Sequence, residues 1–98
     1  MKTLIKNGTL VTAESSIKAD LLIEGEHISQ IAPVIDCADA ELIDASGMFV
    51  LPGGIDAHVH INLPMGETVS SDDYYTGSKA AAFGGTTTII DFVSQDAG

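Results

Sequence analysis

Three residues at alternating positions, Asp56, His58 and His60, are the part of the sequence best suited to chemistry. On a β-strand, side chains two residues apart point to the same face, so this spacing groups one carboxylate and two imidazoles. Two imidazoles on one face can bind a single metal ion through their ring nitrogens. Asp56 is then either a third ligand or a group that orients its neighbours. The pattern predicts half of a metal centre, with His58 and His60 as the ligands.

The surroundings of this motif bear on a plainer interpretation, in which the histidines are ordinary polar residues on a half-exposed strand. Glycines precede the motif and a loop–helix–strand pattern follows it. This order places the histidines at the C-terminal end of a strand, where the active sites of α/β barrels form. Catalytic zinc usually has three protein ligands. No histidine follows His60, and Asp91 is more simply interpreted as a strand-end or helix-capping residue.

The second half of the chain reads as one βα unit followed by a second strand. Its elements are expected in this order: a strand at 54–60, a loop at 62–71, a helix at about 72–83 and a strand at 86–93. Residues 70–73, Ser-Ser-Asp-Asp, are candidates to cap the helix, and two glycines at 84–85 can end it. The last strand is β-branched and nearly continuously apolar, which is typical of a strand buried on both faces.

The first half reads as short strands joined by tight turns, which together form a small all-β layer. The strands are expected at 3–6, 9–12, 20–24, 27–31, 41–44 and 48–51. Asn7-Gly8 predicts a hairpin between the first two, because both residues tolerate a positive φ. Gly25-Glu26 predicts a second hairpin. Residues 33–40 are expected to form a loop, and His27 is expected on the surface.

The composition excludes several classes of protein. Four lysines, no arginine and 14 acidic residues give a net charge of −10, so neither a nucleic-acid nor a membrane partner is expected. Apolar residues at 45% against 18% charged residues are typical of a folded domain. The apolar runs are too short to span a bilayer. The single cysteine, Cys37, cannot form an internal disulfide, which favours a cytoplasmic location.

The motif and its flanks resemble a known family. The stretch 50–60 resembles the first-strand signature of the amidohydrolase superfamily, a Pro-Gly pair followed by Asp-x-His-x-His. The segment 72–92 is similar to the hydantoinase/dihydropyrimidinase branch of the cyclic amidohydrolases. Residues 4–9, 20–24 and 43–47 match as well, so the resemblance covers nearly the whole chain.

The resemblance implies an α/β fold in two parts. Residues 1–51 would be the N-terminal part of a small β-sandwich. Residues 52–98 would be the first βα unit and the second strand of a (β/α)₈ TIM-like barrel, which is incomplete here. Because such a barrel needs roughly 250 residues, we expect the chain to be an N-terminal piece of a longer parent protein.

The same resemblance implies how the parent works. His58 and His60 would bind one of two zinc ions, and Asp56 would orient these ligands without binding the metal itself. A metal-bound hydroxide would attack the carbonyl of a cyclic amide. A bridging carboxylated lysine and a general-base aspartate would come from later in the parent chain. No catalytic residue is therefore expected within these 98 residues, and the chain alone is expected to be inactive.

The loop after His60 bears on the substrate. In the dihydroorotase branch, the second residue after the motif is usually an arginine that binds a carboxylate, and here it is Asn62. The resemblance therefore favours an uncharged cyclic ureide, a hydantoin or a dihydropyrimidine. Asn62, Leu63 and Met65 would form a gate over the ring substituent. Met65 suits that place because methionine is flexible and apolar, although ordinary loop packing explains it equally well.

The expected partners are this small-molecule substrate, the remainder of the same chain, and copies of the parent in a homotetramer. Two other readings stay open. One is a non-catalytic relative that serves as a scaffold or binds a partner, against which the presence of both His58 and His60 argues. The other is a free-standing binding module, against which the unfinished sheet argues.

Overall fold

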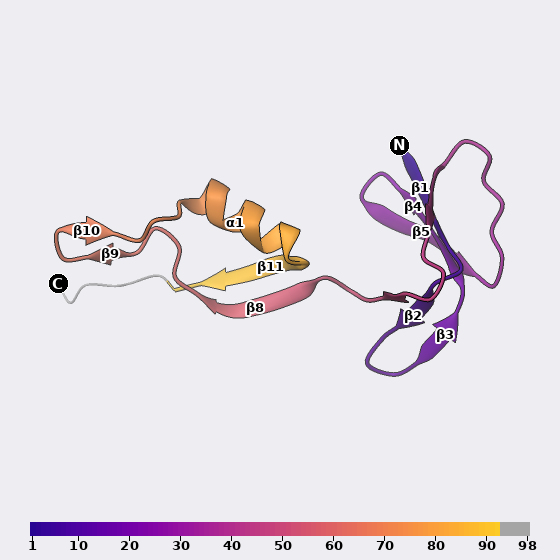
Figure 1. Ribbon diagram of the computed structural model, residues 1–98, viewed down its shortest axis with the longest axis horizontal. Helices are drawn as coiled ribbons and strands as arrows, with labels where there is room; N and C mark the ends of the chain where they lie inside the picture. The colour runs from indigo at the N-terminus through magenta and orange to yellow at the C-terminus, as the bar shows by residue number, and fades with distance from the viewer. Residues whose placement is uncertain (93–98) are drawn as a thin grey trace. The chain divides into compact units, whose positions relative to one another are not determined.

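The computed structural model describes residues 1–92, which form two compact units that divide after Pro52 (Figure 1). The first unit, Met1–Pro52, contains strands without a helix, and the second, from Gly53, contains strands and one helix. No helix in the described part of the chain is long and apolar enough to cross a membrane.

One sheet of the first unit has the strand order β5-β4-β1-β6. Its strands are β1 (Lys2–Lys6), β4 (Asp20–Glu24), β5 (His27–Ala32) and β6 (Glu41–Asp44). β4 runs antiparallel to β1 and β5, and β6 runs parallel to β1. Leu4 and Leu22, which face each other across β1 and β4, pack with Ile35 into one cluster of buried side chains.

A second sheet has the order β3-β2-β7. Its strands are β2 (Thr9–Val11), β3 (Ser16–Lys18) and β7 (Phe49–Val50). Leu10 of β2 and Leu21 of β4 form a second cluster with Ala19, so side chains from both sheets share this part of the core. Because side chains alternate along a strand, Leu21 and Leu22 serve different clusters.

The hairpin predicted at Asn7-Gly8 is wrong, whereas the one at Gly25-Glu26 is confirmed. Asn7 does take a positive φ of 64°, yet β1 and β2 lie in different sheets. The backbone N–H of Asn7 donates to Asp20 at 2.9 Å, and the amide of its side chain donates to Asp44 at 3.0 Å. Hydrogen bonds to residues distant in sequence therefore hold Asn7 in a bend at which the chain passes from one sheet into the other.

Asp20 is the buried carboxylate at this crossing. It accepts hydrogen bonds from the backbone N–H groups of Asn7 and Ile35, and Lys6 lies 3.6 Å away. These groups favour the ionised form, with the Asn7 N–H as the largest cause, and they lower the pKa of Asp20 although burial acts in the opposite direction.

This lowered pKa predicts how stability depends on pH. A carboxyl whose pKa falls on folding stabilises the native state above its unfolded pKa, and this contribution is lost as the pH falls through the folded pKa. We expect Asp20→Asn to lower the free energy of unfolding at neutral pH and to flatten its decline below about pH 4. Urea unfolding of the intact protein at a series of pH values measures both effects. Asp36→Asn is the matched control, because the Asp36 side chain is 97% exposed. Equal curves for wild type and Asp20→Asn would contradict the prediction.

The second unit pairs β8 (Gly54–Val59) with β11 (Thr86–Asp91) in parallel. The helix α1 (Tyr74–Phe83) connects them, after a short hairpin of β9 (Pro64–Met65) and β10 (Thr68–Val69). The helix predicted at about 72–83 is thus confirmed. Asp73 caps it in a capping box with Thr76, as expected for the Ser-Ser-Asp-Asp run. The loop predicted at 62–71 contains the unexpected hairpin.

A glycine lets α1 lie close to the chain that follows β8. A Cβ on Gly77 would stand 3.2 Å from the Cδ1 of Ile61, which is tighter than ordinary contact. Gly77 lowers helix propensity, and this close approach explains its presence.

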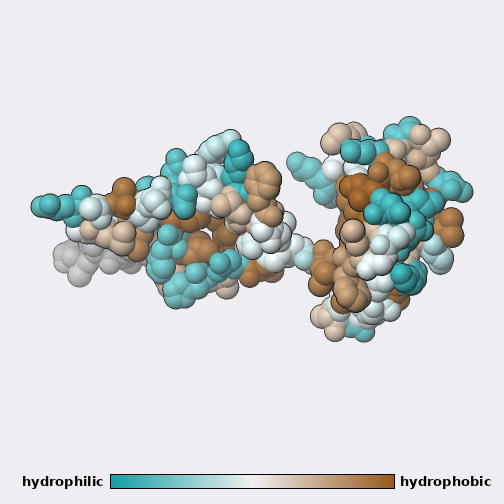
Figure 2. Space-filling view, viewed as in Figure 1, coloured by the Kyte–Doolittle hydropathy of each residue, from teal (hydrophilic) through white to brown (hydrophobic). Residues whose placement is uncertain are grey.

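Large apolar side chains remain exposed on the second unit. Within residues 53–92, no apolar side chain belongs to the buried class; Ile55 is 68% exposed and Ile90 is 53% exposed. Figure 2 shows apolar residues in brown at the surface of both units. The expectation that the last strand is buried on both faces is therefore not met within this chain. β11 pairs with β8 along one edge, and no strand among residues 1–92 pairs with its other edge.

Candidate metal centre

His58 and His60 converge at the end of β8. His58 lies within the strand and His60 directly follows it. Their Nε2 atoms are 3.1 Å apart, and the ring planes are inclined at 71°. Two nitrogens bound to one tetrahedral zinc ion, each about 2.0–2.1 Å from it, would be about 3.3 Å apart. The pair therefore fits a shared metal ion, and 3.1 Å is equally the distance of a hydrogen bond between neutral rings.

Asp56 lies on the same strand, but its carboxylate is directed to the backbone. Its Oδ1 accepts a hydrogen bond from the N–H of His58 at 3.1 Å. The contact holds the main chain of β8 next to a histidine. It does not involve an imidazole nitrogen.

Of the three residues predicted as a substrate gate, Asn62 and Leu63 precede β9 and Met65 ends it. Asn62 has a positive φ of 54°. Leu63 and Ser70 close the base of the hairpin: the Leu63 N–H donates to the Ser70 hydroxyl at 2.8 Å, and the Ser70 N–H donates to the Leu63 carbonyl at 2.9 Å. Met65, at the tip, is 54% exposed.

Asp91 and Phe92 lie beside the histidines, and the sequence pattern did not assign them to the site. The Phe92 ring centroid is 4.3 Å from that of His58 and 5.2 Å from that of His60. The Asp91 carboxylate accepts hydrogen bonds from the Tyr74 hydroxyl at 2.8 Å and from the Ile61 N–H at 3.4 Å. In the sequence, the only indication of this arrangement was the change from apolar residues to an acidic one at the end of the strand.

These contacts also set the acidity of the carboxyl. The hydrogen bond from Tyr74 is the largest cause that lowers the pKa of Asp91, and the same bond raises the pKa of the Tyr74 phenol. Asp91 is thus an anion engaged by a hydroxyl and two backbone amides, those of Ile61 and Phe92.

A third metal ligand is not assembled in the part of the chain that the structure describes. Within residues 1–92, no three His, Cys, Asp or Glu side chains are grouped so as to bind one ion. A cavity of about 310 Å³ lies next to His60 and is also lined by Asp56, Asp72 and Ile61. The site thus consists of two converging imidazoles with open space beside one of them.

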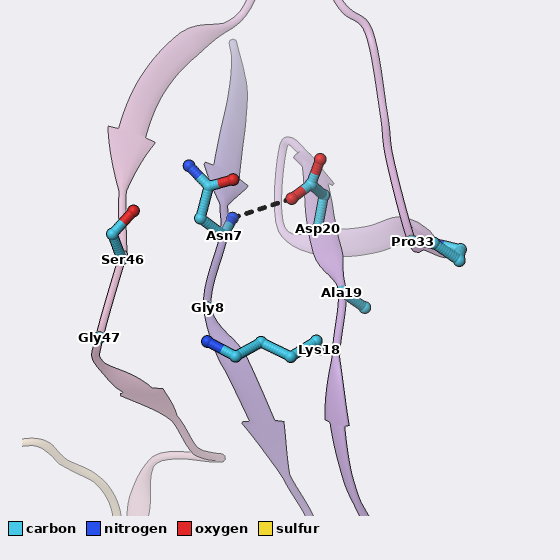
Figure 3. Close-up of a pocket in the computed structure, with 8 residues that line it drawn as sticks. All are labelled: Asn7, Gly8, Lys18, Ala19, Asp20, Pro33, Ser46 and Gly47. Atoms are coloured by element: carbon cyan, nitrogen blue, oxygen red, sulfur yellow. Dashed lines mark hydrogen bonds between the residues drawn. The ribbon is translucent and has the colours of Figure 1, made fainter.

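A second hollow, of about 490 Å³, lies in the first unit, and Figure 3 shows its lining. Its acid, Asp20, already accepts the backbone N–H of Asn7, drawn as the dashed line. The Asn7 side chain and the Ser46 hydroxyl both donate to Asp44. These polar groups of the hollow therefore bind one another and stabilise the bend at which the chain passes between the two sheets.

Comparison with known proteins shows the family to which this chain belongs. The model of the amidohydrolase family matches residues 49–97. The chain is 54% identical over its whole length to D-hydantoinase of Geobacillus stearothermophilus and 52% identical to D-phenylhydantoinase of Escherichia coli O1:K1 / APEC over 93% of the chain. It spans about a fifth of the length of these curated relatives, 21% and 20%.

Solved structures give the same result. The chain matches a crystal structure of dihydropyrimidinase from Brevibacillus agri NCHU1002 with a TM-score of 0.89 at 52% identity. The match covers 99% of this chain and 22% of the dihydropyrimidinase chain. A crystal structure of D-hydantoinase matches with a TM-score of 0.94 at 51% identity. That match covers the whole of this chain and 21% of the D-hydantoinase chain. The chain therefore belongs to the amidohydrolase family, and within it resembles the hydantoinase/dihydropyrimidinase branch. The mixed sheets and single helix of residues 1–92 match the N-terminal part of hydantoinase structures.

Proposed function

We propose that this chain is part of a metal-dependent hydrolase that opens cyclic amide rings, with hydantoins or dihydropyrimidines as substrates. The observation that carries the proposal is the convergence of the two imidazole Nε2 atoms, 3.1 Å apart, at the end of β8. The names of the relatives, D-hydantoinase and dihydropyrimidinase, support the substrate class. Bound metal, proposed as two zinc ions, would polarise a ring carbonyl and activate water.

The proposed architecture assigns residues 1–51 to the N-terminal part of a β-sandwich and residues 52–98 to the start of a (β/α)₈ barrel. The parallel pair of β8 and β11, connected through α1, is the repeating unit of such barrels. The exposed Ile55 and Ile90 side chains would be covered by further strands and helices of the same protein. A homotetramer is proposed on the resemblance to the family.

The chemistry would be divided between this chain and the rest of the protein. His58 and His60 would hold one metal ion, and Asp56 would keep the main chain at His58 in place. Two imidazoles are fewer ligands than a catalytic zinc site usually has. We therefore expect residues 1–98 alone to be inactive.

The test is ring opening by the intact protein. Purified protein is assayed on hydantoin and dihydrouracil, first with chelator and then with zinc restored. Activity that is lost with chelator and recovered with zinc supports the proposal. A zinc-loaded intact protein that opens neither ring would contradict it, and a binding scaffold on the same fold would become the better explanation.

The β9–β10 hairpin is proposed as the gate over the ring substituent, formed by Asn62, Leu63 and Met65. We expect Met65→Ala to raise KM for hydantoins with a bulky apolar substituent about tenfold, because roughly 1–2 kcal/mol of apolar contact is lost. KM for unsubstituted hydantoin should change little. Met48→Ala is the matched control, since Met48 is also exposed but lies in the first unit. Equal changes for both substrates would show that Met65 does not contact the substituent.

A further inference from the structure

Two consecutive residues at the end of β11 contact the histidine region from different sides. Asp91 lies opposite Val59 in the register of β8 and β11. Along an extended chain, neighbouring side chains point to opposite faces. Phe92 packs against the imidazoles, whereas Asp91 reaches toward Tyr74 of α1. The end of β11 therefore supports the motif on both faces of the strand pair.

Phe92 is the only aromatic ring that the structure places against both imidazoles among residues 1–92. Its centroid lies 4.3 Å from the His58 ring and 5.2 Å from the His60 ring. A ring in van der Waals contact with both imidazoles restricts their rotation. Side chains that are already ordered lose less conformational entropy when they bind, so this restriction favours metal binding.

Asp91 acts on the backbone just beyond His60. It binds the N–H of Ile61 and the hydroxyl of Tyr74, the first residue of α1. Asn62, the next residue, takes a left-handed conformation, so the chain turns sharply directly after this anchor. Without the hydrogen bond from Ile61 to Asp91, only the pairing of β8 with β11 would hold the backbone near His60 against β11.

We propose that Asp91 and Phe92 are positioning residues that hold His58 and His60 in the geometry that binds the metal ion. Phe92 acts on the rings. Asp91, held by the Tyr74 hydroxyl, acts directly on the main chain at Ile61. This inference rests on the proposed function, since it presupposes that the two histidines bind metal. Residues that contact the metal ligands without binding the metal themselves typically contribute 10–100-fold to metal affinity.

The test is titration of Co²⁺ into the metal-free intact protein, with affinity and the visible absorption of the bound cobalt as readouts. Phe92→Leu keeps an apolar side chain but removes the ring, and Phe92→Tyr restores the ring. Tyr74→Phe removes only the hydroxyl that binds Asp91. We expect Phe92→Leu to weaken Co²⁺ binding about tenfold or more and to change the spectrum. Phe92→Tyr should restore both, and Tyr74→Phe should weaken binding several-fold.

Matched controls separate positioning from general stability. Phe49→Leu and Tyr75→Phe change exposed residues of the same types, and neither should alter cobalt binding. Wild-type cobalt affinity and spectrum in both Phe92→Leu and Tyr74→Phe would overturn the positioning proposal, provided that His58→Ala weakens the binding of one cobalt ion. A cobalt stoichiometry, affinity and spectrum left unchanged by His58→Ala and by His60→Ala would instead overturn the metal centre itself, and with it the proposed function.

Discussion

Replacing both His58 and His60 with alanine is expected to lower ring opening by the intact protein at least about a hundredfold and to remove zinc binding at this site. The two Nε2 atoms converge to 3.1 Å, so a metal ion bound there would have both as ligands. Alanine offers no nitrogen, and the residual ligands from elsewhere in the protein would hold the ion weakly. Zinc content after dialysis and kcat/KM on hydantoin measure the two effects.

His27→Ala is the control for this double variant. His27 begins β5 in the first unit and is exposed, so its removal should leave both zinc content and kcat/KM unchanged. Single variants sharpen the test, because each should lose most of the activity if both rings bind the same ion. Unchanged zinc affinity in the double variant would refute the assignment of His58 and His60 as ligands.

Leu22→Ala is expected to destabilise the intact protein by about 2–5 kcal/mol. Leu22 is 7% exposed and packs with Leu4 and Ile35 in the cluster on one face of the first sheet. The substitution removes apolar contact and leaves a cavity that β1 and β4 cannot close, because their register is held by backbone hydrogen bonds. Denaturant unfolding followed by circular dichroism measures the loss.

Leu42→Ala is the matched control, since Leu42 lies in β6 of the same sheet but is 62% exposed. Its replacement should cost less than about 1 kcal/mol if that face is open in the intact protein. A comparable loss in both variants would mean that Leu42 is covered by a part of the protein outside this chain. A negligible loss for Leu22→Ala would contradict the assignment of its cluster to the core.

Local patterns were sufficient where neighbours in sequence are also neighbours in space. The capping run before α1 predicted the helix start to within two residues, since the bond from Thr76 N–H to Asp73 spans only three residues. The hairpin of β4 and β5 was predicted for the same reason, because Gly25 supplies the positive φ that its turn needs.

Local patterns failed where a distant partner decides. Asn7-Gly8 has the chemistry of a hairpin turn, but Asp20 and Asp44 bind Asn7 from other strands and the chain changes sheet. β3 was missed because Ser16–Lys18 is short and polar and is a strand through its pairing with β2. Glycine at position 77 lowers helix propensity, and only the contact with Ile61 explains its presence in α1.

The sequence by itself determined that His58 and His60 lie on one face, because side chains two residues apart on a strand point to the same side. The tertiary structure alone decided what supports these rings. Phe92 and Asp91 lie some thirty residues further along the chain, and Asp91 bonds Ile61 across a separation of 30. No local period encodes that contact, since it exists only because β11 returns through α1 to lie parallel to β8.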